Sequence, residues 1–123
     1  MDVTTISNGI RVATERNPMS EVQAVGVCIG AGSRNETPET TGAAHFLEHL
    51  MFKGTKRRTR MQLEIEVENR GSQLNAYTSR EHTLYYMLNF RGGLAHSVDV
   101  LGDMLTASLV DHYAVEAEKE TIW

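Results

Sequence analysis

Two histidines and a glutamate in the segment His45-Phe46-Leu47-Glu48-His49 have the types and the spacing that metal-dependent hydrolysis requires. Residues three and four apart lie on the same face of a helix, so His45, Glu48 and His49 should project from one side of a single helix. Neutral imidazoles of His45 and His49 could hold a Zn²⁺ from adjacent turns, with Glu48 close enough to take a proton from the metal's water. The order H-x-x-E-H is the inverted form of the H-E-x-x-H zinc motif. From these five residues alone, a solvated polar face on an amphipathic helix is the alternative interpretation.

The composition is that of an ordinary globular domain. The chain has 123 residues, of which 41% are hydrophobic and 23% charged, and its formal net charge of −4 argues against a nucleic-acid-binding protein. No apolar run is long enough to cross a membrane. The first residues lack the character of a signal or transit peptide, so we expect any targeting segment to be absent from this chain.

The single cysteine and a local cluster of basic residues are interpreted as structural features. Cys28 lies within the apolar stretch 25–29, which predicts a small core residue rather than a catalytic thiol. The basic run lacks interleaved aromatic residues and is interpreted as a solvated loop; it consists of Lys53, Lys56, Arg57, Arg58 and Arg60.

Strand patterns occur in the first and third quarters of the chain. The Ser7-Asn8-Gly9 turn predicts an N-terminal hairpin between two short strands. Further strands are predicted at 22–29, 73–78 and 83–90. The strand at 22–29 is nearly continuously apolar towards its end, which suggests burial on both faces.

Helical patterns occupy the segments between and after these strands. Helices are predicted at 43–52, with Thr41 as the capping residue, at 59–69, from 98 to 109, and from about 114 onward. Leu63, Ile65 and Val67 also alternate as in a strand, so that alternative stays open for the second helix. The pattern as a whole predicts one α+β domain.

Three segments resemble the pitrilysin-like (M16) metallopeptidases. Gly42 to Thr55 resembles the metal-binding helix of that family, Leu74 to Tyr86 is similar to the strand pair after it, and Ala31 to Glu36 is similar to the loop before it. The matches occur in order along essentially the whole chain. The resemblance implies an α+β fold with a mixed or antiparallel sheet and helices packed on one side. Residues 1–123 would be a partial N-terminal peptidase domain carrying the H-x-x-E-H motif, the incomplete first half of an M16-type domain.

The resemblance also assigns roles at a zinc centre. His45 and His49 match the two histidine ligands, and Glu48 matches the general base that activates the zinc-bound water. Glu118 matches an acidic residue that supports the site, with a solvated acidic helix face as the alternative. The third ligand of the family, a glutamate, is expected just beyond Trp123.

A substrate-binding strand is implied as well. Asn75 and Ala76 match an edge strand on which the family's substrates are held extended by main-chain hydrogen bonds. An ordinary interior strand at 74–78 is the alternative interpretation.

Within the family, the resemblance is to the presequence-processing branch. It implies a zinc metalloendopeptidase that hydrolyses peptide bonds of imported precursor proteins, binds extended presequence peptides, and pairs with an α-type subunit in the mitochondrial matrix or on the matrix side of the inner membrane. The alternative is a structural core subunit of the respiratory cytochrome bc1 complex (complex III). The presence of His45, Glu48 and His49 together favours the enzyme. Because the third ligand and the partner are not in this sequence, residues 1–123 alone are expected to be inactive.

Overall fold

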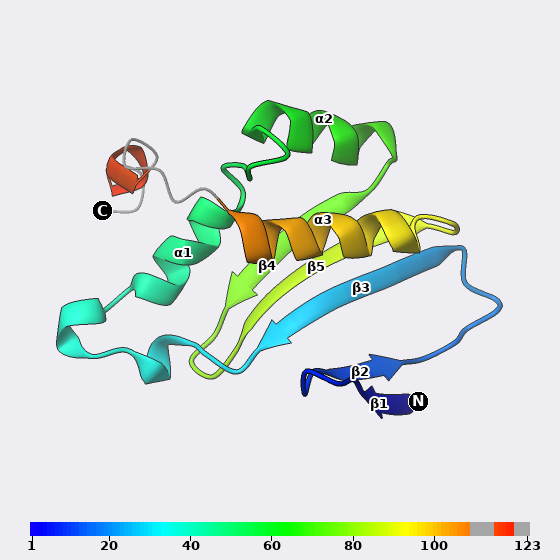
Figure 1. Ribbon diagram of the computed structural model, residues 1–123, viewed down its shortest axis with the longest axis horizontal. Helices are drawn as coiled ribbons and strands as arrows, with labels where there is room; N and C mark the ends of the chain where they lie inside the picture. The colour runs from blue at the N-terminus through cyan, green and yellow to red at the C-terminus, as the bar shows by residue number, and fades with distance from the viewer. Residues whose placement is uncertain (109–114, 120–123) are drawn as a thin grey trace.

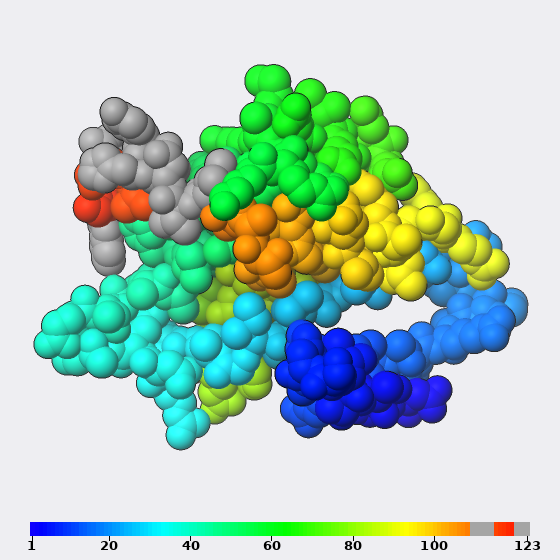
Figure 2. Space-filling model, in the orientation of Figure 1, coloured from blue at the N-terminus to red at the C-terminus, as the bar shows by residue number. Residues whose placement is uncertain are grey.

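Three antiparallel strands form the sheet on which the helices pack (Figure 1). The computed structural model describes residues 1–108 and 115–119. The strand order is β3 (Val22–Ile29), β5 (Thr83–Phe90), β4 (Gln73–Thr78), and a separate hairpin joins β1 (Asp2–Thr5) to β2 (Arg11–Thr14). Figure 2 shows the hairpin, in dark blue, on the opposite side of the molecule from the green helix. The predicted hairpin and the three longer strands are confirmed, and the sheet is antiparallel throughout the described residues.

The helices cover one face of this sheet. They are α1 (Ala43–Met51), α2 (Arg60–Asn69) and α3 (Leu94–Ala107), with short 3-10 turns at Ser33–Asn35 and Pro38–Thr40. Alternate residues of β5 are buried beneath the helices, as the pleat of a half-covered strand requires. The apolar core lies in this layer and contains Met51, Leu63, Val67, Tyr85, Met87, Val100, Leu101 and Met104. The α+β class with helices on one side is therefore confirmed. No helix in the described part of the chain is long and apolar enough to cross a membrane.

The prediction that residues 22–29 form a strand buried on both faces is wrong. β3 pairs with β5 alone among the described strands, and most of its residues are exposed, Val22 to 51%. The helices of the described residues lie on one face of the sheet, so apolar side chains of β3 are accessible on the other face. Cys28, predicted to be a core residue, is exposed for the same reason.

The second helix, for which a strand was the alternative, is a helix with a capping box. Thr59 Oγ1 accepts a hydrogen bond from the backbone N–H of Gln62, and Gln62 Oε1 accepts one from the N–H of Thr59. Leu63 and Val67, four residues apart, are buried on one face, whereas Ile65 is 50% exposed. α3 begins at Leu94, earlier than predicted. Residues 115–119 are helical, and the other residues of the predicted last helix lie outside those described.

The start of α1 is capped by Glu36 rather than by Thr41. Gly42 is the residue before the helix, with φ at 86°, a conformation that favours glycine. The Glu36 carboxylate accepts hydrogen bonds from the backbone N–H groups of Ala44 (2.9 Å) and Gly42 (2.7 Å). These bonds lower the pKa of Glu36. A negative charge at this position also complements the positive end of the helix dipole.

The loop that carries Glu36 is attached to the turn between β4 and β5. The backbone N–H groups of Ser33 and Arg34 donate to the carbonyl oxygens of Ser79 and Arg80, at 3.2 and 2.8 Å. A Cβ at Gly32 would lie 2.3 Å from the Ser79 carbonyl oxygen, so this close approach requires glycine. The loop thus fixes the start of α1 relative to the end of β4.

The basic run is not uniformly solvated, because Arg58 is buried. Its guanidinium donates to Asp103 at 2.7 Å, to Asp99 at 2.7 Å and to Glu66 at 2.8 and 3.2 Å. Arg58 is 8% exposed, and its three carboxylate partners lie on α2 and α3. These bonds raise the pKa of Arg58 and lower the pKa of Glu66 to about 2. A single cation therefore ties the segment after α1 to both other helices.

We predict that Arg58→Met destabilises the fold by about 3–5 kcal/mol, because Asp103 would become a buried carboxylate without its counter-charge. Arg60→Met is the matched control, since Arg60 is exposed and its ion pair within the described residues is with Glu64 at the surface; the loss there should stay below about 1 kcal/mol. Urea unfolding of the two variants measures both values. Equal losses would contradict the structural role of Arg58.

We also predict that Glu66 contributes to the pH dependence of stability. Its pKa falls from 4.5 to about 2, mainly because Arg58 donates hydrogen bonds to its carboxylate. Since the folded-state pKa is the lower one, ionised Glu66 stabilises the fold above the unfolded-state value, and this contribution is lost as the pH falls towards 2. Unfolding free energies of Glu66→Gln should therefore decline less steeply below pH about 4.5 than those of wild type. Glu64→Gln, at an exposed site, should follow wild type.

Candidate metal centre

The two histidines of the motif face one another on α1. Their Nε2 atoms are 3.1 Å apart, with ring centroids 4.7 Å apart and nearly perpendicular ring planes. Two nitrogens bound to one tetrahedral zinc at about 2.0–2.1 Å are separated by roughly 3.3 Å. The separation in this chain therefore fits a pair of ligands to one ion. Within 1–108 and 115–119, no three His, Cys, Asp or Glu side chains are grouped closely enough to hold a metal.

Glu118 lies behind His49. It is only 5% exposed, so the alternative of a solvated acidic side chain does not hold. Its Oε1 accepts a bond from Lys53 Nζ at 2.6 Å. Its Oε2 lies 3.3 Å from His49 Nδ1, and no donor among the described residues meets hydrogen-bond geometry with it. The ammonium of Lys53, more than the imidazole of His49, lowers the pKa of Glu118. A buried carboxylate oxygen with no donor, aimed at the back of a histidine, fits the arrangement in which a carboxylate orients a metal-binding imidazole.

Glu48 is oriented by a threonine from the sheet. Thr78, the last residue of β4, donates from Oγ1 to Glu48 Oε2 at 2.5 Å. The contact is possible because α1 packs against β4. Burial and, secondly, the negative charge of Glu48 raise the pKa of the Tyr85 phenol on the neighbouring strand.

β4 has one unpaired edge among the described strands. It pairs with β5 on one side only. The backbone N–H of Ala76 donates to Asn75 Oδ1 at 2.9 Å instead of to β5, which places this donor at the outer edge. The two residues are thus at the border of the sheet and not in its interior.

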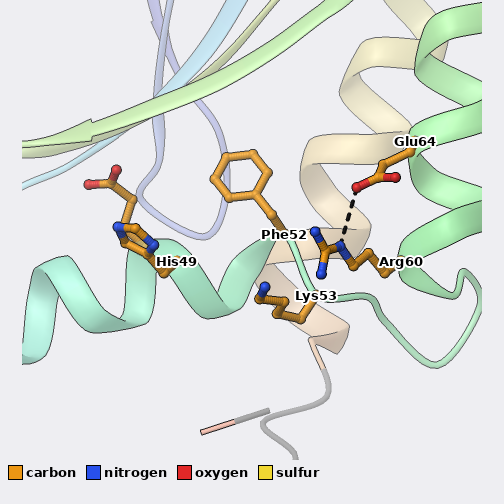
Figure 3. A pocket seen from close by; sticks show the side chains of 6 residues that line it. His49, Phe52, Lys53, Arg60 and Glu64 are labelled. Atoms are coloured by element: carbon orange, nitrogen blue, oxygen red, sulfur yellow. Dashed lines mark hydrogen bonds and ion pairs between the residues drawn. The ribbon is translucent and has the colours of Figure 1, made fainter. Parts of the chain in front are cut away.

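A shallow pocket of about 210 Å³ lies between α1 and α2 beside the motif (Figure 3). Its lining includes Glu48, His49, Phe52, Lys53, Arg60 and Glu64. In Figure 3 the Phe52 ring stands between His49 and the Arg60–Glu64 ion pair, whose closest atoms are 3.2 Å apart. The pocket joins the motif helix to α2.

Two groups of the site were not found by sequence reasoning: Thr78, which contacts Glu48, and Lys53, which contacts Glu118. Thr78 is thirty positions from Glu48 in the sequence, and nothing in a strand pattern marks one threonine as a partner for a distant glutamate. Lys53 was interpreted as part of a solvated loop, yet its spacing of four residues from His49 is a signal that could have found it.

Comparison with known proteins identifies the class to which this fold and site belong. Residues 11–123 match the family described as insulinase (peptidase family M16), so the chain belongs to this family of metallopeptidases. It is 55% identical over 120 residues to the mitochondrial-processing peptidase subunit beta of Caenorhabditis elegans, covering 98% of this chain and 26% of that protein. The corresponding subunit of Saccharomyces cerevisiae is 47% identical over 117 residues, covering 95% of this chain and 25% of that protein.

A solved structure shows the same fold. The crystal structure of a protease from Helicobacter pylori superposes with a TM-score of 0.87 at 27% identity, covering 98% of this chain and 29% of that one. The chain spans about a quarter of the length of the curated relatives that it matches.

Proposed function

We propose that this chain carries the zinc motif of a metalloendopeptidase of the presequence-processing type, which hydrolyses peptide bonds of precursor proteins imported into mitochondria. The observation that carries the proposal is the convergence of the Nε2 atoms of His45 and His49, with Glu48 beside them and held by Thr78. The similarity to mitochondrial-processing peptidase β subunits supports the substrate class.

His45 and His49 are the proposed zinc ligands. When bound, zinc lowers the pKa of a coordinated water and polarises the substrate carbonyl. The imidazoles supply neutral nitrogen donors from one helix face, and Glu118 lies behind one of them as the proposed supporting carboxylate. The glutamate expected beyond Trp123 remains a prediction.

Glu48 is the proposed general base. Its Oε2 is engaged by the Thr78 hydroxyl, which fixes the plane of the carboxylate and leaves Oε1 to accept the proton of the attacking water. The same carboxyl group can then deliver the proton to the leaving amine. The hydrogen bond from the sheet is what keeps this group in position relative to a peptide bound at the sheet edge.

The outer edge of β4 is the proposed binding site for the substrate backbone. An extended peptide can add to an unpaired strand through main-chain hydrogen bonds. Ala76 offers its N–H at this edge, where the Asn75 side chain now accepts it. A substrate carbonyl would replace that intramolecular acceptor, and the peptide would then pass the Glu48 carboxylate at the end of β4.

The proposal includes an α-type partner subunit and a location in the mitochondrial matrix or on the matrix side of the inner membrane. It rests on the names of the relatives, which are β subunits of mitochondrial processing peptidases. The alternative, a structural core subunit of the cytochrome bc1 complex, gains no support from these names.

We predict that substitutions in the motif separate metal binding from catalysis. In a full-length protein carrying this sequence, paired with an α-type subunit, Glu48→Gln should retain zinc but lose at least ~10²-fold in cleavage of a basic fluorogenic presequence peptide. His45→Ala and His49→Ala should lose the zinc itself, because each removes a ligand. Atomic emission measures the metal, and His82→Ala, at an exposed position in the β4–β5 turn, is the control. Normal turnover by zinc-loaded Glu48→Gln would contradict the assignment of Glu48 as general base.

We further predict that cleavage depends on alternate backbone N–H groups of the substrate, because only every second residue of an added strand faces β4. N-methylation of a presequence peptide at those positions should lower kcat/KM about tenfold each, the value of one lost hydrogen bond. Methylation at the intervening positions is the matched control and should have little effect. A loss of the same size at every position would argue against strand addition.

A further inference from the structure

The carboxylate behind His49 has a basic side chain beside each of its two oxygens. Lys53 Nζ lies 2.6 Å from Glu118 Oε1, and His49 Nδ1 lies 3.3 Å from Glu118 Oε2. Glu118 is buried, and Lys53 is the one lysine or arginine within ion-pair distance of it in the described part of the chain. A desolvated carboxylate needs such a counter-charge to remain in place.

The position of Lys53 is set by the backbone after α1. Its N–H donates to the Leu50 carbonyl at 3.1 Å, and the next residue, Gly54, begins a turn with φ at 120°. Although Lys53 lies just beyond the end of α1, it and His49 both approach the same carboxylate, that of Glu118. Figure 3 shows the Lys53 side chain turned back along α1 towards His49. Its side chain is largely covered, at 22% exposure.

A histidine that binds a metal through Nε2 carries its proton on Nδ1, and an acceptor at Nδ1 fixes both the tautomer and the ring orientation. In this chain the Nε2 atom of His49 faces His45, and its Nδ1 faces Glu118. The carboxylate can serve as that acceptor only if it stays beside the ring. Within the described residues, the direct bond from Lys53 is the contact that keeps it there.

We propose that Lys53 is a positioning residue of the metal centre, which holds Glu118 against Nδ1 of His49 and so directs Nε2 of that ring towards the metal. The inference rests on the proposed zinc centre but concerns a residue that has no role in that proposal. Lys53 acts through Glu118 and does not itself bind the metal.

Zinc affinity provides the test. The full-length protein carrying this sequence is titrated in competition with a chromophoric chelator, in the wild type, Lys53→Met, Glu118→Gln and the double variant. Lys53→Met should weaken zinc binding about 10–100-fold, as removal of an outer-shell partner does. In the Glu118→Gln background the same substitution should have little further effect, because the two residues act in series. Lys53→Arg, which keeps the charge, should retain most of the affinity.

Lys56→Met is the matched control, since Lys56 is an exposed lysine in the same turn and should leave zinc affinity unchanged. Circular dichroism checks that each variant is folded, and Lys53→Gln replaces Lys53→Met if the latter does not fold. Unchanged affinity in the Lys53 variant, or an equal loss with and without Glu118→Gln, would overturn the inference while leaving the zinc centre intact. A wild type that binds no zinc would overturn both.

Discussion

Carboxylates contact α1 near both of its ends, Glu36 before the helix and Glu118 beside its last turn. Glu36 accepts hydrogen bonds from two backbone N–H groups, and Glu118 accepts one from the ammonium of Lys53, just after the helix. Because the loop of Glu36 is itself attached to the β4–β5 turn, the helix is held at the end of the sheet edge. The contact between Glu48 and Thr78 depends on this placement, whereas the spacing of His45, Glu48 and His49 is set by α1 itself. A helix free to slide by one residue would move the motif off that edge.

In the part of the chain that the structure describes, helices cover one face of the sheet, and this asymmetry separates the stabilising core from the candidate site. The apolar core lies between the sheet and the helices, and the ion network around Arg58 joins α2 to α3. The motif lies at the border of that layer, where α1 meets β4 and the side chains become partly accessible. A rigid interior can thus support a polar, accessible site without burying its charged groups completely. Among the charged groups of the candidate site, Glu118 is the one that is almost fully buried.

Local patterns predicted the elements because each strand or helix contains its own signal. The Asn8-Gly9 turn, the capping residues Thr59 and Gln62, and the H-x-x-E-H spacing act over a few residues. Predictions failed where the outcome depended on distant partners. In the sequence Arg58 is indistinguishable from the other basic residues of its run, because its three carboxylate partners lie on α2 and α3. The strand at 22–29 was predicted to be buried because a strand's sequence does not show whether one or both faces of its sheet are covered. The pairing of His45 with His49 was predictable because helical spacing is local. The contact of Glu48 with Thr78 was not, because it depends on how a helix packs against a strand distant in the sequence.

The hydrogen bond from Ala76 N–H to the side chain of Asn75 has a consequence for how this protein behaves between encounters with other chains. An unpaired strand edge is a template on which unrelated chains can aggregate, and proteins commonly block such edges with charges, prolines or bulges. Here the amide oxygen of the neighbouring Asn75 side chain accepts the hydrogen bond from this N–H. A side chain can rotate away when a better acceptor arrives, whereas a proline would close the edge for good. The strand edge can therefore be both protected and open to pairing. Which state prevails depends on whether the Asn75 amide oxygen or an incoming carbonyl forms the stronger hydrogen bond with the Ala76 N–H.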